Sequence, residues 1–163
     1  MRPRDRGGAA APRASGAAVR LALSVHGRDA FAGLPARRTL RRWVQLALEH
    51  DAEIALSFVG AREGRKLNRV FRGRDDATNV LTFDYAQRPR VVADIAICVP
   101  VVRREAREQG KTFRAHLAHL VIHGTLHAQG YDHQRPGQAR AMETREVELL
   151  ARLRIPSPYD DRR

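Results

Sequence analysis

The stretch TFRAHLAHLVIHGTLHAQGYDH, Thr112 to His133, places histidines and apolar residues at the spacing of one long helix. Four of the seven histidines fall into one stripe at about 100° per residue: His116, His119, His123 and His127. Apolar side chains form a roughly opposite stripe: Leu117, Leu120, Val121 and Ala128. We expect the apolar stripe to pack on a sheet and the histidine stripe to face a cleft or solvent. Thr112 is a typical N-cap and Gly130 a typical helix end, which predicts a helix from Phe113 to about Gln129.

The second half of this stretch has the spacing of a metal site. His123 and His127 are four residues apart, so their imidazoles stack one turn apart. Gly130 can reverse the chain and return His133 to the same ion. Three neutral imidazoles suit zinc and leave a fourth position open for water or substrate, as in catalytic zinc sites, although they also suit nickel, copper and iron. The sequence predicts one Zn²⁺ per chain, with His116 and His119 as core or surface histidines or as supports of the site.

The spacing of these histidines also matches the metzincin protease pattern, H-E-x-x-H-x-x-G-x-x-H. The glutamate of that pattern is the general base of peptide hydrolysis, and Gly124 stands in its place. Three neutral ligands leave the charge of the ion uncompensated, which favours an anionic substrate such as a phosphodiester over a peptide. A zinc peptidase therefore remains only a weak alternative.

The composition agrees with an anionic partner. The chain has 163 residues, enough for one domain, and its 30 Lys and Arg against 18 Asp and Glu give a net charge of +12. One cysteine excludes a disulfide framework and a cysteine zinc site, which fits a reducing cytoplasm. No apolar run approaches the length of a membrane span. Residues 1–18 are interpreted as a disordered basic tail, and 156–163 as a short flexible C-terminus.

The remaining periodicities predict the order β-α-β-α-β-β-α-α-α. Alternation predicts strands over 19–25, 54–59, 79–85 and 91–99, the last two antiparallel neighbours. Helical spacing predicts helices over 40–48, 62–71 and 100–110, the histidine helix, and a final amphipathic helix that ends before Pro156. In the helix 62–71 we expect Leu67, Val70 and Phe71 to face inward. The predicted class is α+β: one domain with a four-stranded mixed sheet, packed with helices and carrying a zincin-like histidine helix.

Three blocks of the sequence resemble the YbeY family, the bacterial rRNA maturation factors and single-strand-specific endoribonucleases. The block from His123 to His133 resembles the family's signature. The segments 67–72 and 78–83 are similar to the part ahead of its third strand, and 93–98 is similar to its fourth strand. The resemblance covers about residues 19–155, which it implies are a metal-dependent endoribonuclease domain.

The resemblance implies a function and a set of residues. It implies zinc on His123, His127 and His133, and it makes Arg72 the basic residue needed for RNA cleavage, with His127 also catalytic. In the family this activity serves 3′-end maturation of small-subunit (16S) rRNA and ribosome quality control. It implies the small subunit and assembly factors such as the Era GTPase as partners.

Several polar residues have two interpretations. Arg72 can grip a phosphate and stabilise transition-state charge, or pair on the surface with Asp75 or Asp76. Asp94, in an apolar strand, can orient a ligand imidazole or an arginine, or cap a loop, and Asp132 can support the site or form an Asx-turn. Arg72 belongs to a run of basic residues that is interpreted as a track for RNA phosphates. The run contains one acid, Glu63, and five further cations: Arg62, Arg65, Lys66, Arg69 and Arg74.

Two functions from different classes follow. The first is a cytoplasmic zinc-dependent endoribonuclease that acts on single-stranded RNA. The second is a non-catalytic ribosome-assembly factor in which zinc only stabilises the fold, because the sequence displays no obvious general base.

Overall fold

The computed structural model of the chain describes residues 18–74, 77–132 and 134–159. The strands are β1 (Leu21–His26), β2 (Ala52–Val59), β3 (Val80–Ala86) and β4 (Val91–Cys98). The helices are α1 (Arg37–Ala47), α2 (Ala61–Arg72), α3 (Val99–Glu108), α4 (Phe113–Ala128) and α5 (Pro136–Arg152), with a short 3₁₀ helix, η1 (Arg28–Ala30), after β1. The predicted order and the predicted α+β class are confirmed.

The four strands form one mixed sheet in the order β1-β2-β4-β3. β1, β2 and β4 are parallel, and β3 runs antiparallel to β4, as predicted for these two neighbours. Leu56 lies opposite Ile95 in the β2–β4 pair, and Phe83 lies opposite Asp94 in the β3–β4 pair. β3 is therefore an edge strand, and its outer side is open to other groups.

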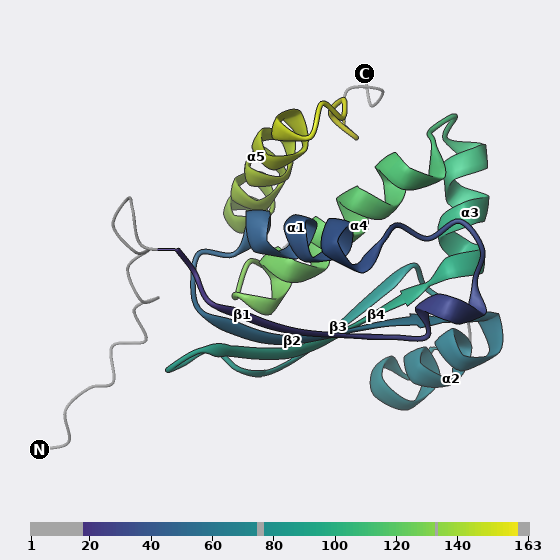
Figure 1. Ribbon diagram of the computed structural model, residues 1–163, viewed down its shortest axis with the longest axis horizontal. Coiled ribbons are helices and arrows are strands. Elements are labelled where there is room, and N and C mark those ends of the chain that lie inside the picture. The colour runs from purple at the N-terminus through teal and green to yellow at the C-terminus, as the bar shows by residue number, and fades with distance from the viewer. Residues whose placement is uncertain (1–17, 75–76, 133, 160–163) are drawn as a thin grey trace, which may run out of the picture.

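Helices cover the two faces of the sheet unequally. α1, α4 and α5 lie over one face, whereas α2 lies on the other (Figure 1). A Cβ on Gly124 of α4 would lie 3.0 Å from Cγ2 of Ile95, and one on Gly64 of α2 would lie 3.0 Å from Sγ of Cys98. Because side chains alternate along β4, Ile95 and Cys98 face opposite sides of the sheet. The face that carries α4 holds the core, and we call the face that carries α2 the open face.

The core forms where α1, α4 and α5 meet the first of these faces. Its largest fully buried side chains come from all these layers: Leu40, Ile54, Leu56, Ile95, Ile97, Leu117, Ile122, Leu126, Met142, Leu149 and Leu150. Trp43 and Cys98 are also buried. Within the described residues, no helix is both long and apolar enough to span a bilayer.

α4 is the central helix, and both of its ends follow the sequence prediction. Oγ1 of Thr112 accepts a hydrogen bond from the backbone N–H of Ala115 at 3.1 Å, which is an N-cap. Gly130 adopts a φ of +101°, and the N–H of Tyr131 then reaches the carbonyl of Leu126 at 3.3 Å. A left-handed residue at this position closes the helix and turns the chain back.

One expectation about helix faces holds in part and another is wrong. His116 and His119 line a hollow beside α1 and the C-terminal segment, and His119, His123 and His127 are half-buried, but His116 is buried because α3 and α5 pack against α4. In α2, Leu67 is only half-buried, and Val70 and Phe71 are exposed. The helix instead buries Gly64 and Asn68, since Gly64 allows its backbone to approach the Cys98 side chain closely. This rotation turns Val70 and Phe71 outward.

Candidate metal centre and active site

His123 and His127 lie on successive turns of α4, and each ring is oriented by a hydrogen bond from Nδ1. Nδ1 of His123 lies 2.5 Å from Oε1 of Glu146 in α5, and Nδ1 of His127 lies 2.9 Å from the carbonyl oxygen of Tyr131. Both oxygens can only accept, so both imidazoles donate from Nδ1. A neutral imidazole that donates from Nδ1 carries its lone pair on Nε2, which is the arrangement found around metal-ligating histidines.

The turn after α4 places the Tyr131 carbonyl that accepts the hydrogen bond from His127. Gly130 brings the backbone of Tyr131 back beside the ring of His127, and the Tyr131 hydroxyl donates to Glu49 at 2.9 Å. These contacts hold the turn that leads to residue 133. His133, the third predicted ligand, lies outside the described residues. Asp132 accepts the N–H of Gln134 at 2.8 Å, which is the Asx-turn.

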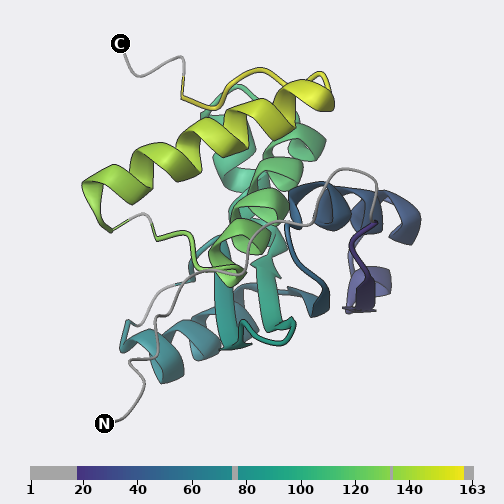
Figure 2. The ribbon, with the colours of Figure 1, turned by 90° about the vertical axis from the view of Figure 1, so that its left-hand side faces the viewer.

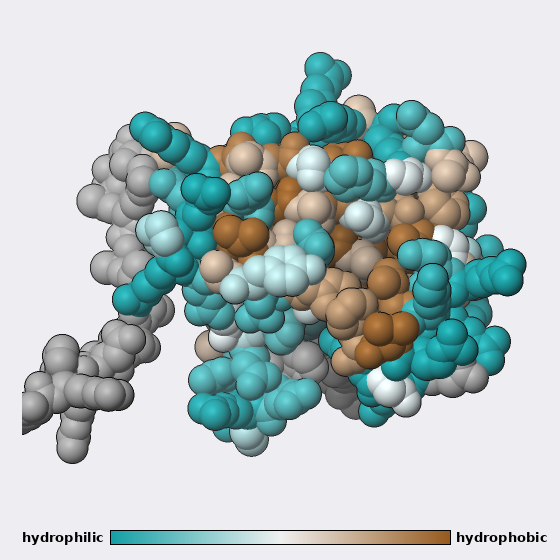
Figure 3. Space-filling model, turned by 90° about the horizontal axis from the view of Figure 1, so that it is seen from below, coloured by the Kyte–Doolittle hydropathy of each residue, from teal (hydrophilic) through white to brown (hydrophobic). Residues whose placement is uncertain are grey.

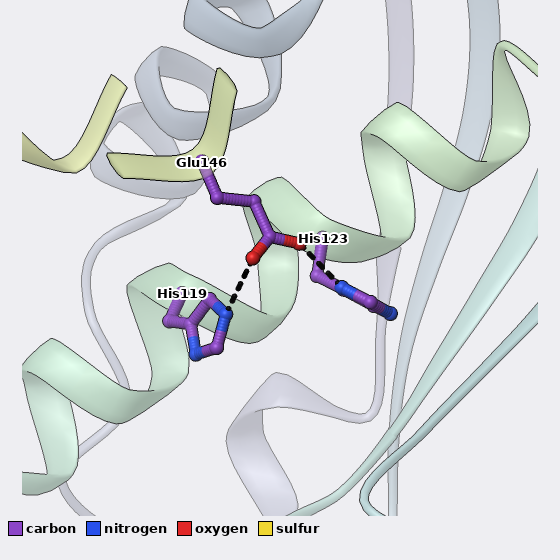
Figure 4. A group of neighbouring side chains, drawn as sticks. All are labelled: His119, His123 and Glu146. Atoms are coloured by element: carbon purple, nitrogen blue, oxygen red, sulfur yellow. Dashed lines mark hydrogen bonds and ion pairs between the residues drawn. The ribbon is translucent and has the colours of Figure 1, made fainter. Parts of the chain in front are cut away.

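Glu146 is a functional residue that the sequence analysis missed. Its side chain is fully buried, and it accepts hydrogen bonds from His123 and from Nε2 of His119 at 3.0 Å (Figure 4). The hydroxyl of Tyr159 donates to the same carboxylate. A signal was present, because position 146 falls on the apolar face of α5 between Met142 and Leu149. A carboxylate at a core position requires partners, and here three donors supply them.

The carboxylate of Glu146 is ionised. Burial raises its pKa, but the hydrogen bonds from His119 and His123, together with the positive potential of these rings when they are protonated, outweigh burial and lower the pKa to about 2. An ionised acceptor strengthens the bond to His123 and fixes the orientation of that ring. Tyr159 lies in the segment that was predicted to be flexible, and its contacts extend this network to the C-terminal end of the described chain.

His119, His123 and Glu146 also form a group that could hold a metal ion, since one ligand atom of each lies within 4.8 Å of the others. Ligand atoms around a tetrahedral zinc, each about 2.0–2.1 Å from the ion, lie about 3.3 Å apart. The 2.5 Å between His123 and Glu146 is shorter and is a hydrogen-bond distance. We therefore interpret this group as a network that orients His123.

His116 belongs to a separate buried cluster. Its Nε2 lies 3.1 Å from Oε1 of Glu105 in α3, and the same oxygen accepts from Nδ2 of Asn79 at 3.0 Å. Burial lowers the pKa of His116, more than Glu105 raises it. His116 is thus the core histidine that the sequence analysis allowed, and it ties α4 to α3 and to the start of β3.

The predicted basic residues lie on α2 and just beyond it. Arg72 is in the last turn of α2, and all six cations of the run are exposed. Arg62, Arg65, Lys66 and Arg69 line a shallow hollow together with Gly60 and Glu63. Asp75 and Asp76, the alternative partners of Arg72, lie outside the described residues.

The edge strand β3 connects the end of α2 with the histidine helix. The rings of Phe71 and Phe83 lie 4.5 Å apart on the open face. On the other face, Oγ1 of Thr82 lies 3.5 Å from the carbonyl oxygen of Gly124, which follows His123. Phe71, the neighbour of Arg72, thus contacts β3 on the open face, and Gly124, the neighbour of His123, lies against β3 on the opposite face.

Asp94 is not brought to the histidines. It pairs with Phe83 in the sheet and faces the open side, opposite α4. Its Oδ2 accepts a hydrogen bond from the hydroxyl of Tyr85 at 2.9 Å.

We expect Glu146→Gln to lower the zinc affinity of the protein by about 10- to 100-fold, because the neutral amide holds the His123 ring less firmly. The measurement is a competition titration against a chelator, with Glu148→Gln as control, since Glu148 is an exposed carboxylate on the same helix. An unchanged affinity in the folded Glu146→Gln protein would show that this network does not support a metal.

A family model described as Endoribonuclease YbeY matches residues 33–154. Curated proteins named Endoribonuclease YbeY include one from Aromatoleum aromaticum, 51% identical over 146 residues, which covers 88% of this chain and 95% of the relative. Another, from Bordetella pertussis, is 55% identical over 154 residues, covering 87% of this chain and 98% of the relative.

One solved structure has a similar fold. The solution structure of the protein TM1509 from Thermotoga maritima matches with a TM-score of 0.54 and 27% sequence identity. The match covers 81% of this chain and 91% of that protein. The family model, over residues 33–154, includes β2, β3 and β4, the basic helix α2 and the histidine helix α4.

Proposed function

This chain belongs to the endoribonuclease YbeY family, and we propose that it is a zinc-dependent endoribonuclease that cuts single-stranded RNA in the cytoplasm. The observation that carries the proposal is the pair of histidines on α4, His123 and His127, which both donate from Nδ1 to fixed acceptors. This is the tautomer that metal-ligating histidines adopt, and the basic surface of α2 favours a polyanionic substrate.

The donor set fits a zinc ion. His123, His127 and His133 would hold it, with Glu146 and the Tyr131 carbonyl orienting the first two rings. When bound, zinc supplies a positive charge that polarises a phosphodiester and lowers the pKa of a coordinated water. His127 would be catalytic in this sense, because its ring would help to hold the ion that supplies this charge.

The basic residues of α2 and the segment after it would bind the RNA phosphates. Arg72 would grip the phosphate through two parallel hydrogen bonds and stabilise the negative charge that grows in the transition state. Arg62, Arg65, Lys66, Arg69 and Arg74 would bind neighbouring phosphates without reading the bases. Asp132 would only shape the turn before His133.

The resemblance to the family extends the proposal to a cellular role. We propose that the RNA is small-subunit rRNA, and that the enzyme matures the 3′ end of 16S rRNA and takes part in ribosome quality control. Its partners would then be the small ribosomal subunit and assembly factors such as Era.

A peptidase is disfavoured by the packing around Gly124. A Cβ at this position would lie 3.0 Å from Ile95, 3.3 Å from Thr82 and 3.4 Å from Val80. A side chain here would require these side chains of β3 and β4 to give way by a few tenths of an ångström, and a whole glutamate would add to that crowding. Gly124 lets α4 approach the sheet closely, and the general base of the metzincin pattern is absent from this position.

A non-catalytic assembly factor remains the second candidate, for one reason. Glu146, the carboxylate that bonds to His123, is fully buried and already accepts three hydrogen bonds, so it is not placed to take a proton from a nucleophile. Zinc would then serve stability alone.

A cleavage assay separates the two functions. We expect the purified full-length protein to cut a single-stranded RNA of about 20 nucleotides and to leave the matching duplex intact. Chelation should abolish cleavage, and zinc should restore it, with metal content measured in each sample. One zinc per chain without any cleavage would contradict the endoribonuclease and favour the assembly factor.

A further inference from the structure

Exposed aromatic and apolar side chains gather where α2 ends beside β3. Among the described residues, Val70, Phe71 and Tyr85 are large hydrophobic side chains left 64%, 60% and 65% exposed. Single exposed apolar residues are common, but these three lie within the last turn of α2 and on the adjacent strand. Figure 3, which views the molecule from below, shows apolar surface bordered by hydrophilic side chains.

Phe71 does not stand alone. Its ring centroid lies 4.5 Å from that of Phe83, and the two planes are tilted by 55°. Phe83 is half-buried on the edge strand, and its contact with Phe71 restricts the orientation of the Phe71 ring. An aromatic ring that packing has already oriented can stack on a ligand at little cost in conformational entropy.

The charges around this pair identify the kind of ligand. Arg69 and Arg72 lie on the same turn of α2, and Arg74 follows two residues later. Cations interleaved with exposed aromatic rings are typical of surfaces that bind single-stranded nucleic acid, where the backbone meets the cations and the bases stack. A purely apolar partner would remove water from these guanidinium groups, which costs free energy.

The position of the pair relates it to the metal centre. Phe83 lies on the open face of β3, and its neighbour Thr82 contacts Gly124 on the opposite face, next to His123. Because β3 is an edge strand, no further described strand separates its two faces along its outer side. Figure 2, turned a quarter from Figure 1, gives a second view of α2, the sheet and α4.

We infer that Phe71, supported by Phe83, is the platform on which one unpaired base of the RNA substrate stacks while Arg72 holds the adjacent phosphate. This inference rests on the proposed function and adds a reason for its strand preference. A base inside a duplex is already paired and stacked, so it cannot reach the ring, whereas a single strand can turn one base outward.

The test uses the full-length protein and a single-stranded RNA that carries one 2-aminopurine, whose fluorescence falls when it stacks. Binding is read by stopped flow in the first second, before cleavage products accumulate. We expect Phe71→Ala to weaken single-strand binding about tenfold, to remove the fluorescence decrease, and to raise KM with little change in kcat. Phe71→Trp should retain all three properties, and the weaker affinity for duplex RNA should not change.

Tyr85→Ala is the matched control. Tyr85 is as exposed as Phe71 and lies on the same face, but its hydroxyl is bonded to the Asp94 carboxylate, whose charge repels phosphate. We expect this variant to bind within about twofold of wild type, well below the effect of a lost stacking contact. Equal losses in both variants, or wild-type binding and fluorescence in Phe71→Ala, would overturn the inference.

The outcomes also separate the inference from the proposed function. If the wild-type protein cuts RNA and Phe71→Ala behaves identically, the platform is wrong and the endoribonuclease stands. If the wild-type protein shows the fluorescence decrease but cuts no RNA, the platform is supported and the proposed function is wrong.

Discussion

His127→Ala is expected to reduce RNA cleavage by at least about a thousandfold and to lower bound metal below one ion per chain. Removing one of three imidazole ligands costs the site the positive charge that stabilises the transition state, which is worth several kcal/mol, and each 1.36 kcal/mol is tenfold in rate. The measurements are initial rates on a single-stranded RNA and metal content after gel filtration. His26→Ala, at an exposed histidine on β1, should leave both unchanged.

Metal analysis of His119→Ala beside His127→Ala distinguishes two candidate sets of metal ligands. If His123, His127 and His133 hold the ion, His119→Ala should keep one metal per chain, although its affinity should fall because Glu146 loses one partner. If His119, His123 and Glu146 hold the ion, His119→Ala should lose it and His127→Ala should keep it. Retention of metal and full activity in His127→Ala would refute the proposed centre.

The sequence predicts the elements that repeat a simple pattern. The four strands alternate or run apolar. α4 begins at Thr112 and ends near Gly130, because capping and left-handed backbone depend on local chemistry. The tautomers of His123 and His127 required the structure, since their acceptors come from α5 and from the turn after α4.

The features that the sequence analysis missed depend on packing between distant segments. Glu146 and His119 are 27 residues apart in the chain, and their contact exists only once α5 crosses α4. Helical spacing suggested that Val70 and Phe71 are buried, but it cannot show that Gly64 brings another side of α2 onto Cys98. The contact between Gly64 and Cys98 sets the rotation of α2 about its axis, and this rotation leaves Val70 and Phe71 on the surface.

Arg72→Ala is expected to lower kcat by about 100- to 1000-fold without changing metal content or melting temperature. A positioned donor aimed at developing negative charge contributes on this scale, and Arg72 is an exposed residue in the last turn of α2, so its removal leaves no cavity. The assay is single-turnover cleavage at saturating protein, which separates the chemical step from binding. Thermal unfolding and zinc analysis of the same preparation show whether fold and metal are intact.

Two further variants show what Arg72 contributes. Arg72→Lys keeps the charge but loses the planar pair of donors, so it should recover only part of the rate if two hydrogen bonds to one phosphate matter. Arg140→Ala removes an exposed cation from α5, outside the basic run, and should change neither kcat nor KM beyond about twofold, because salt screens exposed charges. A rise in KM with unchanged kcat in Arg72→Ala would place this arginine among the phosphate contacts of the track and remove it from the chemical step, because uniform binding alters affinity alone.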